Sequence, residues 1–238
     1  MIDGMVLDNK NCSRNRRKTG GFTLLEMIIV VGIIAVLSAV VIFVLNPAET
    51  LKKSRDAQRL SDLATVKTAL GLYLISTSTI QLDNQSGMPT CKNSTGNKTL
   101  YLSYSSDAPG ATSTDGSLDS PNATSSQKAF INLGLTNGNG WIPINLSQLT
   151  GGAPISNFPV DPLNRIADVA NVTSTDTVYR YMCDEDDSTF EVNADLESIA
   201  YETANSVDNK EEVDGGNNRY MLEVGNKLDI LNCTATAC

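Results

Sequence analysis

The sequence predicts an α+β protein in which a long N-terminal helix precedes a small antiparallel β-sheet. A 24-residue apolar run, Phe22–Leu45, lies near the N-terminus. Apolar side chains then recur at helical spacings to about Ser76. Short segments with β-branched and aromatic residues appear in the last third of the chain, which is typical of strands.

The apolar run Phe22–Leu45 predicts a membrane span. As a helix it would be roughly 36 Å long, which exceeds a hydrocarbon core of about 30 Å. Its only charged residue is Glu26. Because the run is apolar on all sides and follows a basic cluster, a membrane span is favoured over a buried core helix. The basic cluster also places the N-terminus in the cytoplasm by the positive-inside rule.

Charge is distributed unevenly along the chain. The formal net charge is −9, but residues 1–21 carry five basic and two acidic residues. Residues 80–238 carry 8 basic and 21 acidic residues. The acidic balance argues against a nucleic-acid-binding surface, so no nucleic-acid partner is expected. The sequence has no histidine, which excludes histidine-based catalysis and most zinc chemistry.

The residues before the apolar run form a recognisable processing motif. Small residues, Gly20 and Gly21, precede the run instead of following it, so cleavage there would leave the helix on the mature protein. The register from Arg16 to Glu26 resembles the prepilin cleavage and methylation motif of type IV pilins and type II secretion pseudopilins. The resemblance covers about residues 14–75, with a fainter likeness in the C-terminal half.

This resemblance implies a fold, a processing route and partners. A prepilin peptidase would cut after Gly21, Phe22 would be N-methylated, and Glu26 would be the acidic fifth mature residue used in assembly. The implied fold is the pilin fold, with a long helix packed on the β head. The implied partners are further copies in a helical filament, the peptidase, an inner-membrane assembly platform and membrane lipid.

Glu26 also has a physical interpretation of its own. A carboxylate inside a membrane helix costs a few kcal/mol unless it is paired. The new amine of Phe22 on a neighbouring copy could pair with it, and that pair would specify the axial register. The alternative is a carboxylate that lies at headgroup level near the membrane edge.

Asn46–Glu49 is a helix-start signal, with Asn46 as cap and Pro47 at the first helical position. The alternative is a proline kink in one continuous helix. Beyond it, an apolar stripe is predicted from Leu60, Leu63, Ala64, Val66, Leu70, Tyr73 and Leu74. The rest of the circumference is assigned to Arg55, Arg59, Asp62 and Lys67.

Five regions are therefore expected. They are a cleaved basic leader at 1–21, a transmembrane and assembly helix at 22–45, an amphipathic stalk helix at 46–76, a Ser/Thr-rich connecting loop at 77–140, and an antiparallel β head with a C-terminal disulfide region at 141–238. The loop should contain at least a short strand near residues 100–104. In the head, strands are predicted at Thr177–Cys183, Thr189–Leu196 and Arg219–Val224.

The cysteine count predicts disulfides. Cys12 lies in the leader, which leaves Cys91, Cys183, Cys233 and Cys238 in the mature chain. An even number in an exported, loop-rich head indicates disulfides rather than metal ligation. Four cysteines allow three pairings, and Cys91–Cys183 with Cys233–Cys238 is favoured because it closes a short terminal loop and ties the long connection to the sheet.

No cofactor is expected. Asp184, Asp186 and Asp187 are calcium candidates, because the major pseudopilins that this chain resembles bind calcium in a C-terminal loop. Neither these residues nor the stretch Asp208–Asp214 has the spacing of a calcium-binding loop such as the EF-hand. A solvated acidic turn is the favoured interpretation.

The expected function is that of a structural subunit of a type IV pilus-like extracellular filament, and no enzymatic activity is expected. The alternative is a pseudopilin of a type II secretion system. The long Ser/Thr-rich connection and the disulfides favour a surface filament. Before assembly the protein should be a single-pass protein of the cytoplasmic membrane.

Overall fold

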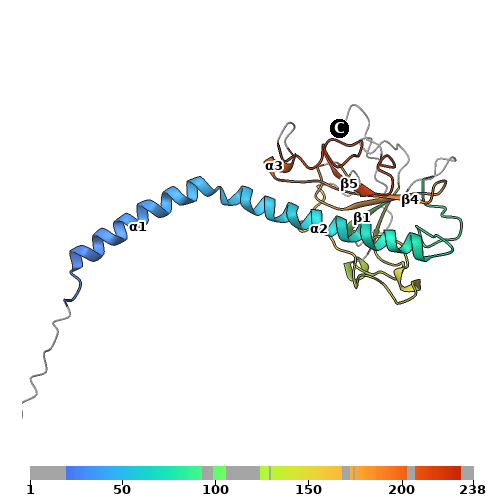
Figure 1. Cartoon of the computed structure of the whole chain (residues 1–238), viewed down its shortest axis with the longest axis horizontal. Coiled ribbons are helices and arrows are strands. Elements are labelled where there is room, and N and C mark those ends of the chain that lie inside the picture. The colour runs from blue at the N-terminus through green and yellow to red at the C-terminus, as the bar shows by residue number, and fades with distance from the viewer. Residues whose placement is uncertain are drawn as a thin grey trace, which may run out of the picture. The chain divides into compact units, whose positions relative to one another are not determined.

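The computed structural model describes residues 20–92, 99–105, 124–128, 130–167, 172–173, 175–202 and 207–231. The chain forms two compact units, residues 1–46 and 47–238. Figure 1 shows the helices and strands of both. The first unit contributes one helix, and the second contains a helix and a β-sheet.

Helix α1 spans Leu24–Leu45. The hydroxyl of Thr23 caps its N-terminus by accepting a hydrogen bond from the backbone N of Glu26 at 3.2 Å. The helix ends at Asn46, which adopts a left-handed conformation with φ 38°, a geometry that asparagine tolerates better than most residues. Within the described part of the chain, α1 is the one helix that is long and apolar enough to cross a membrane.

Helix α2 spans Pro47–Ser76, so Pro47 is its first residue, as predicted. Its stripe of buried side chains includes Leu63, Val66, Leu70 and Tyr73. Two assignments to the helix faces were wrong.

Ala64 was expected on the stripe but is exposed, and Ala69 is buried instead. Arg59 was expected on the polar face but is fully buried, as is Asp56. The reason is geometric, because positions 56, 59, 63, 66, 70 and 73 continue one series of three- and four-residue steps. The buried face of α2 therefore begins with charged residues.

The sheet of the second unit has the order β2-β1-β3-β4-β5. The strands are β1 (Thr99–Ser105), β2 (Thr124–Lys128), β3 (Arg180–Asp184), β4 (Thr189–Ala194) and β5 (Leu222–Gly225). The pairs β1–β3, β3–β4 and β4–β5 are antiparallel, which confirms the small antiparallel sheet and the α+β class. The remaining elements are the 3-10 turns η2 (Phe130–Asn132) and η3 (Leu146–Gln148) and the short helix α3 (Ile199–Glu202).

Strand β2 lies inside the region predicted as a connecting loop and pairs with β1 in parallel. Its sequence, TSSQK, has no alternation of apolar side chains that would have predicted a strand. The connection between α2 and β3 thus adds an edge strand to the sheet as well as containing the predicted strand β1.

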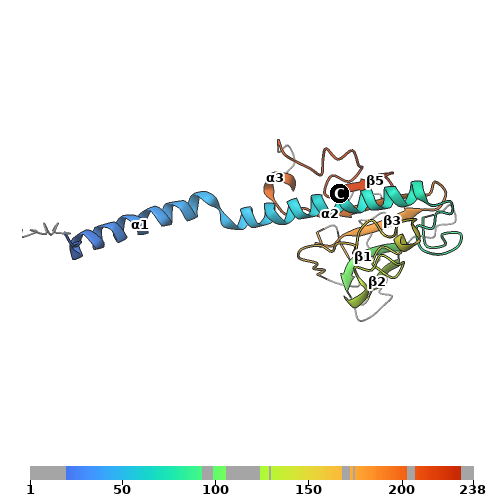
Figure 2. The same ribbon diagram turned by 60° about the horizontal axis from the view of Figure 1, so that its bottom comes forward.

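The two faces of the sheet carry different side chains because neighbouring strand residues point to opposite sides. On one face, Tyr101, Tyr181, Phe190 and Val192 belong to the same buried cluster as the apolar stripe of α2. Figure 2 shows α2 running along this sheet. On the other face, which we call the back face, Leu100, Leu102 and Met182 pack with Met221, Ile230 and Leu231.

A disulfide joins Cys91 to Cys183 across 92 residues of sequence. It is the pairing that the sequence favours, and it fixes the chain after α2 to strand β3. Backbone hydrogen bonds from Lys92 N to Cys183 O at 2.7 Å and from Glu185 N to Lys92 O at 2.8 Å support the same junction. Cys12, Cys233 and Cys238 lie outside the described residues.

We expect the exported protein to contain a peptide in which Cys91 and Cys183 are covalently linked. The fold brings the two cysteines together, and both are fully buried, so their sulfur atoms are protected from solvent. Non-reducing peptide mass spectrometry of alkylated protein measures this directly. Recovery of both cysteines as alkylated free thiols would contradict it.

Candidate assembly helix and buried ion-pair cluster

The predicted cleavage site lies directly before α1, where Gly20, Gly21 and Phe22 are in neither helix nor strand. Phe22 is 74% exposed, and a Cβ placed on either glycine would have no neighbour within 4 Å. Within the described part of the chain, the residues on both sides of the Gly21–Phe22 peptide bond are therefore exposed.

Glu26 lies in the first turn of α1, where the helix dipole favours a negative charge. Its backbone N is bound by Thr23, but its exposed carboxylate has no hydrogen-bond or ion-pair partner among the residues that the structure describes. The described side chains of α1 are all exposed as well. The first unit thus presents an apolar surface with one unpaired acid near its N-terminal end.

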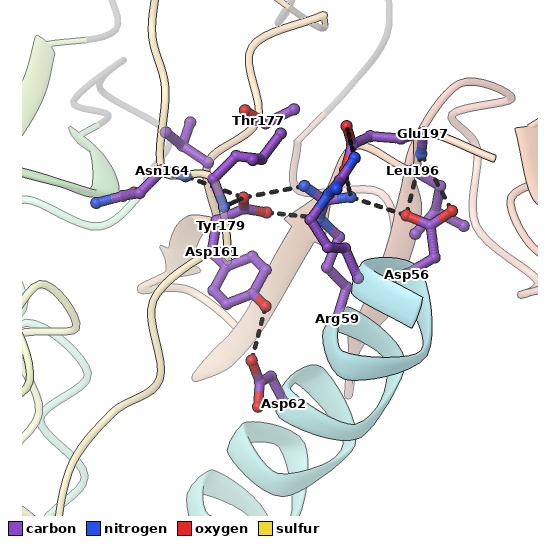
Figure 3. Close-up of polar contacts among 12 residues, drawn as sticks. Asp56, Arg59, Asp62, Asp161, Asn164, Thr177, Tyr179, Leu196 and Glu197 are labelled. Atoms are coloured by element: carbon purple, nitrogen blue, oxygen red, sulfur yellow. Dashed lines mark hydrogen bonds and ion pairs between the residues drawn. The ribbon is translucent and has the colours of Figure 1, made fainter. Parts of the chain in front are cut away.

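In the second unit, Arg59 is the centre of a buried ion-pair cluster (Figure 3). Its guanidinium binds Asp161 through two hydrogen bonds, Nε to Oδ2 at 2.6 Å and Nη2 to Oδ1 at 3.0 Å. Nη1 also donates to Asp56 Oδ1 at 2.8 Å and to Glu197 Oε2 at 2.7 Å. Arg55 adds a second bidentate pair with Glu197, at 2.7 and 2.9 Å.

The carboxylates of the cluster also organise backbone. Asp56 accepts hydrogen bonds from the backbone N of Glu197 and of Ser198, the latter at 2.8 Å. Asp161 accepts from the backbone N of Leu163 and of Asn164, at 2.9 and 3.1 Å. The cluster therefore connects the N-terminal part of α2 to two loops, one after β4 and one at the Asp161–Pro162 turn.

The folded protein favours the charged forms of Arg59 and Glu197. Burial opposes the charge of Arg59, but its hydrogen bonds and attraction to Asp161 outweigh burial, so the pKa of Arg59 is raised. Burial likewise opposes the charge of Glu197, and hydrogen bonds from Arg55 and Arg59 outweigh it, so the pKa of Glu197 is lowered. Two guanidinium groups thus face the three carboxylates of Asp56, Asp161 and Glu197.

A neighbouring contact extends the cluster along α2. The hydroxyl of Tyr179 donates to Asp62 Oδ2 at 2.8 Å, and burial raises the pKa of the Asp62 carboxyl. The ring of Tyr179 packs against Trp141, whose indole N donates to Pro159 O at 2.8 Å. The same stretch of α2 is therefore linked to the aromatic core.

The sequence analysis missed this cluster. A signal was available, because Asp56 and Arg59 have opposite charges three residues apart at the start of the apolar stripe. Nothing local in the sequence identifies Glu197 as a further partner of Arg59, because the two residues are 138 positions apart. Long-range charge pairing of this kind requires the fold.

The calcium candidates do not converge. Asp184 is bound to Lys227 at 3.5 Å and accepts the backbone N of Asp186 at 3.0 Å, while Asp187 binds Lys227 at 2.7 Å. Across the described ranges, no group of three or more acidic, cysteine or histidine side chains is arranged to hold a metal ion. The lysine supplies the positive charge at this turn.

The apolar N-terminal helix and the α+β head fit one class of protein, a membrane-anchored precursor. A profile of the prokaryotic N-terminal methylation motif matches residues 16–42, which include the predicted cleavage site, Glu26 and most of α1. This match supports placing the chain in the type IV pilin and pseudopilin family. Neither the curated proteins nor the solved structures contain a match to the chain.

Proposed function

We propose that the protein is a structural subunit of a type IV pilus-like extracellular filament, assembled after leader cleavage and N-methylation of Phe22. The observation that carries the proposal is the match of the methylation motif to residues 16–42, which extends into the exposed apolar helix α1. Cleavage at Gly21 leaves this helix on the mature protein. A subunit that keeps such a helix must cover it, first with lipid and then with other copies.

The chemistry of assembly follows from the charges at the end of α1. Cleavage creates an amine at Phe22, four residues before the unpaired carboxylate of Glu26. Lipid tails are as apolar as the helix itself, so apolar burial alone does not select one packing arrangement in the membrane. A pair between the amine of one copy and Glu26 of the next does select one axial register.

The head is a compact unit that each copy would carry into this assembly. Arg59 and its partners attach the N-terminal part of α2 to two loops, and the Cys91–Cys183 disulfide attaches its C-terminal connection to the sheet. The proposed partners are further copies of this chain, a prepilin peptidase, an inner-membrane assembly platform and lipid. The proposed orientation before assembly has the leader in the cytoplasm, because the leader is basic.

Filaments sheared from intact cells test the proposal. Electron microscopy should show thin filaments in the sheared fraction, and mass spectrometry should identify this chain as a component of them. Deletion of its gene should remove those filaments. Finding the mature chain only in the periplasm, with none in the sheared fraction, would contradict the pilus proposal and favour a secretion pseudopilus.

A further inference from the structure

The back face of the sheet contains two buried glutamates on adjacent strands. Glu191 lies on β4 and Glu223 on β5, and both side chains are at most 2% exposed. Asn193 pairs with Glu223 in the β4–β5 register and lies on the same face as Glu191. Asn193 Nδ2 lies 3.5 Å from Glu223 Oε1, and Glu191 Oε1 is buried with no hydrogen-bond partner among the described residues. Two ionised carboxylates have only acceptors, so one of them can satisfy a buried oxygen of the other only if the pair holds a proton.

One oxygen of each carboxyl group, which we call its outer oxygen, accepts hydrogen bonds from backbone N–H groups of a neighbouring segment. Glu191 Oε2 accepts the backbone N of Ile230 at 2.8 Å and of Leu231 at 3.0 Å. Glu223 Oε2 accepts the backbone N of Asn218 at 3.0 Å. A Cβ on Gly216 would lie 1.5 Å from Glu223 Oε2, so only glycine allows the loop to approach this closely. The pair therefore joins the sheet to the segment that contains Ile230 and Leu231.

We propose that Glu191 and Glu223 share one proton, and that this proton holds the C-terminal segment, residues 226–231, on the back face of the sheet. With the proton present, one negative charge is distributed over a pair whose outer oxygens are satisfied by backbone amides. Without it, two like charges face each other in a buried site, and moving the segment away to admit water relieves both the repulsion and the desolvation. Release of the segment would expose Ile230, Leu231 and Met221.

Charged side chains on the neighbouring elements include Asp214, Arg180 and Lys227, and Arg180 is fully buried. The loop before β5 contributes Asp214, which accepts the backbone N of Glu223 and adds a third carboxylate. On β3, Arg180 donates to the carbonyl oxygens of Val178 and Asp176. In the C-terminal segment, Lys227 is bound to Asp184 and Asp187 at the surface and lies 4.0 Å from Asp229.

The direction of the pH dependence follows from burial. Burial, reinforced by the neighbouring carboxyl group of Glu191, raises the pKa of Glu223 to about 9, and burial raises the pKa of Glu191. A group with a raised folded pKa stabilises the docked state fully below its ordinary pKa, and this stabilisation is lost as the pH rises toward the folded value. Docking should weaken by up to about tenfold per pH unit from about pH 5 to about pH 9.

Two other acids would lower the stability of the whole head as the pH rises through a similar range. Burial raises the pKa of Asp195 to about 7 and that of Glu211 to about 8. The test must therefore be local. Hydrogen-exchange protection of residues 226–231 in the full-length protein in detergent, corrected for intrinsic exchange rates, can be compared with protection of α2 in the same sample.

We expect protection of residues 226–231 to fall between about pH 5 and about pH 9 by at least tenfold more than protection of α2. The variant Glu223→Gln keeps a donor to Glu191 but cannot titrate, so its local protection should follow that of α2 across the range. Glu191→Gln provides a second non-titrating pair if the first variant does not fold. Glu212→Gln, a change at a partly exposed pair with Arg219, is the matched control and should behave like the unmodified chain.

Three results would overturn the proposal. One is local protection in the unmodified chain that follows α2 at every pH. Another is an unchanged local fall in a folded Glu223→Gln or Glu191→Gln variant. The third is restoration of protection at high pH by calcium chloride but not by calcium chloride with excess chelator, because the pair would then hold a cation instead of a proton.

Discussion

Replacing Glu26 with leucine is expected to abolish filament assembly, or reduce it strongly, without preventing membrane insertion or leader cleavage. In the isolated subunit Glu26 is near the end of α1 and can reach headgroups or water, so removing its charge eases insertion. In a filament the same position would be enclosed by neighbouring apolar helices. An amine of Phe22 left without its carboxylate partner there costs several kcal/mol. The substitution therefore penalises the assembled state and spares the monomer.

The measurement scores two stages in the same cells: leader cleavage by the mass of the subunit, and assembly by the yield of sheared filament. Glu26→Asp keeps the charge and should retain part of the yield, whereas Glu26→Gln keeps the size and should lose it. Val30→Leu, an apolar change on the same exposed helix, is the matched control and should assemble normally. Normal cleavage with a normal filament yield in Glu26→Leu would show that the carboxylate does not specify register.

Replacing Arg59 with methionine is expected to lower the unfolding free energy of the head by about 3–5 kcal/mol. Methionine approximates the length of the arginine side chain but leaves Asp56, Asp161 and Glu197 as buried carboxylates with one fewer cation. The loss should be largest at neutral pH. Burial opposes the charge of Glu197, but hydrogen bonds from Arg55 and Arg59 outweigh burial and lower its pKa, so the part of the difference that depends on Glu197 should disappear as the pH falls through this lowered pKa.

Chemical denaturation of the full chain in detergent measures this effect, with tryptophan fluorescence reporting on Trp141, which is fully buried. Arg59→Lys retains the charge but cannot make the bidentate contact with Asp161. Its unfolding free energy should therefore lie between those of the unmodified chain and of Arg59→Met. Lys67→Met is the matched control, because Lys67 is exposed on the same helix. A difference below about 1 kcal/mol between Arg59→Met and Lys67→Met would indicate that the cluster is structurally dispensable.

Several features of the fold could be predicted because they depend on local patterns. The length of the apolar run predicts α1, Pro47 marks the first residue of α2, and three- and four-residue spacing identifies most of its buried side chains. Alternation along Thr189–Leu196 identifies β4. The Cys91–Cys183 pair was favoured because it ties a long connection to a strand, and the structure contains it.

The features that were missed depend on contacts between distant segments. From the sequence alone Arg59 is assigned to a solvated face, and only the fold brings Asp161 and Glu197 to it. Strand β2 has a polar sequence, and only its pairing with β1 makes it a strand. Glu191 looks like an ordinary strand glutamate on an exposed face, because the segment that helps to bury it lies 39 and 40 residues further along the chain.

The central claim is that the chain is a prepilin-type precursor whose apolar helix stays on the mature protein. Mass spectrometry of the N-terminal peptide of the mature protein tests it most directly. The account predicts a peptide that begins at Phe22 and carries one N-methyl group, with Gly21 and all preceding residues absent. A mature protein that keeps residues 1–21, or one that begins beyond Leu45, would contradict the claim and the assembly mechanism that depends on it.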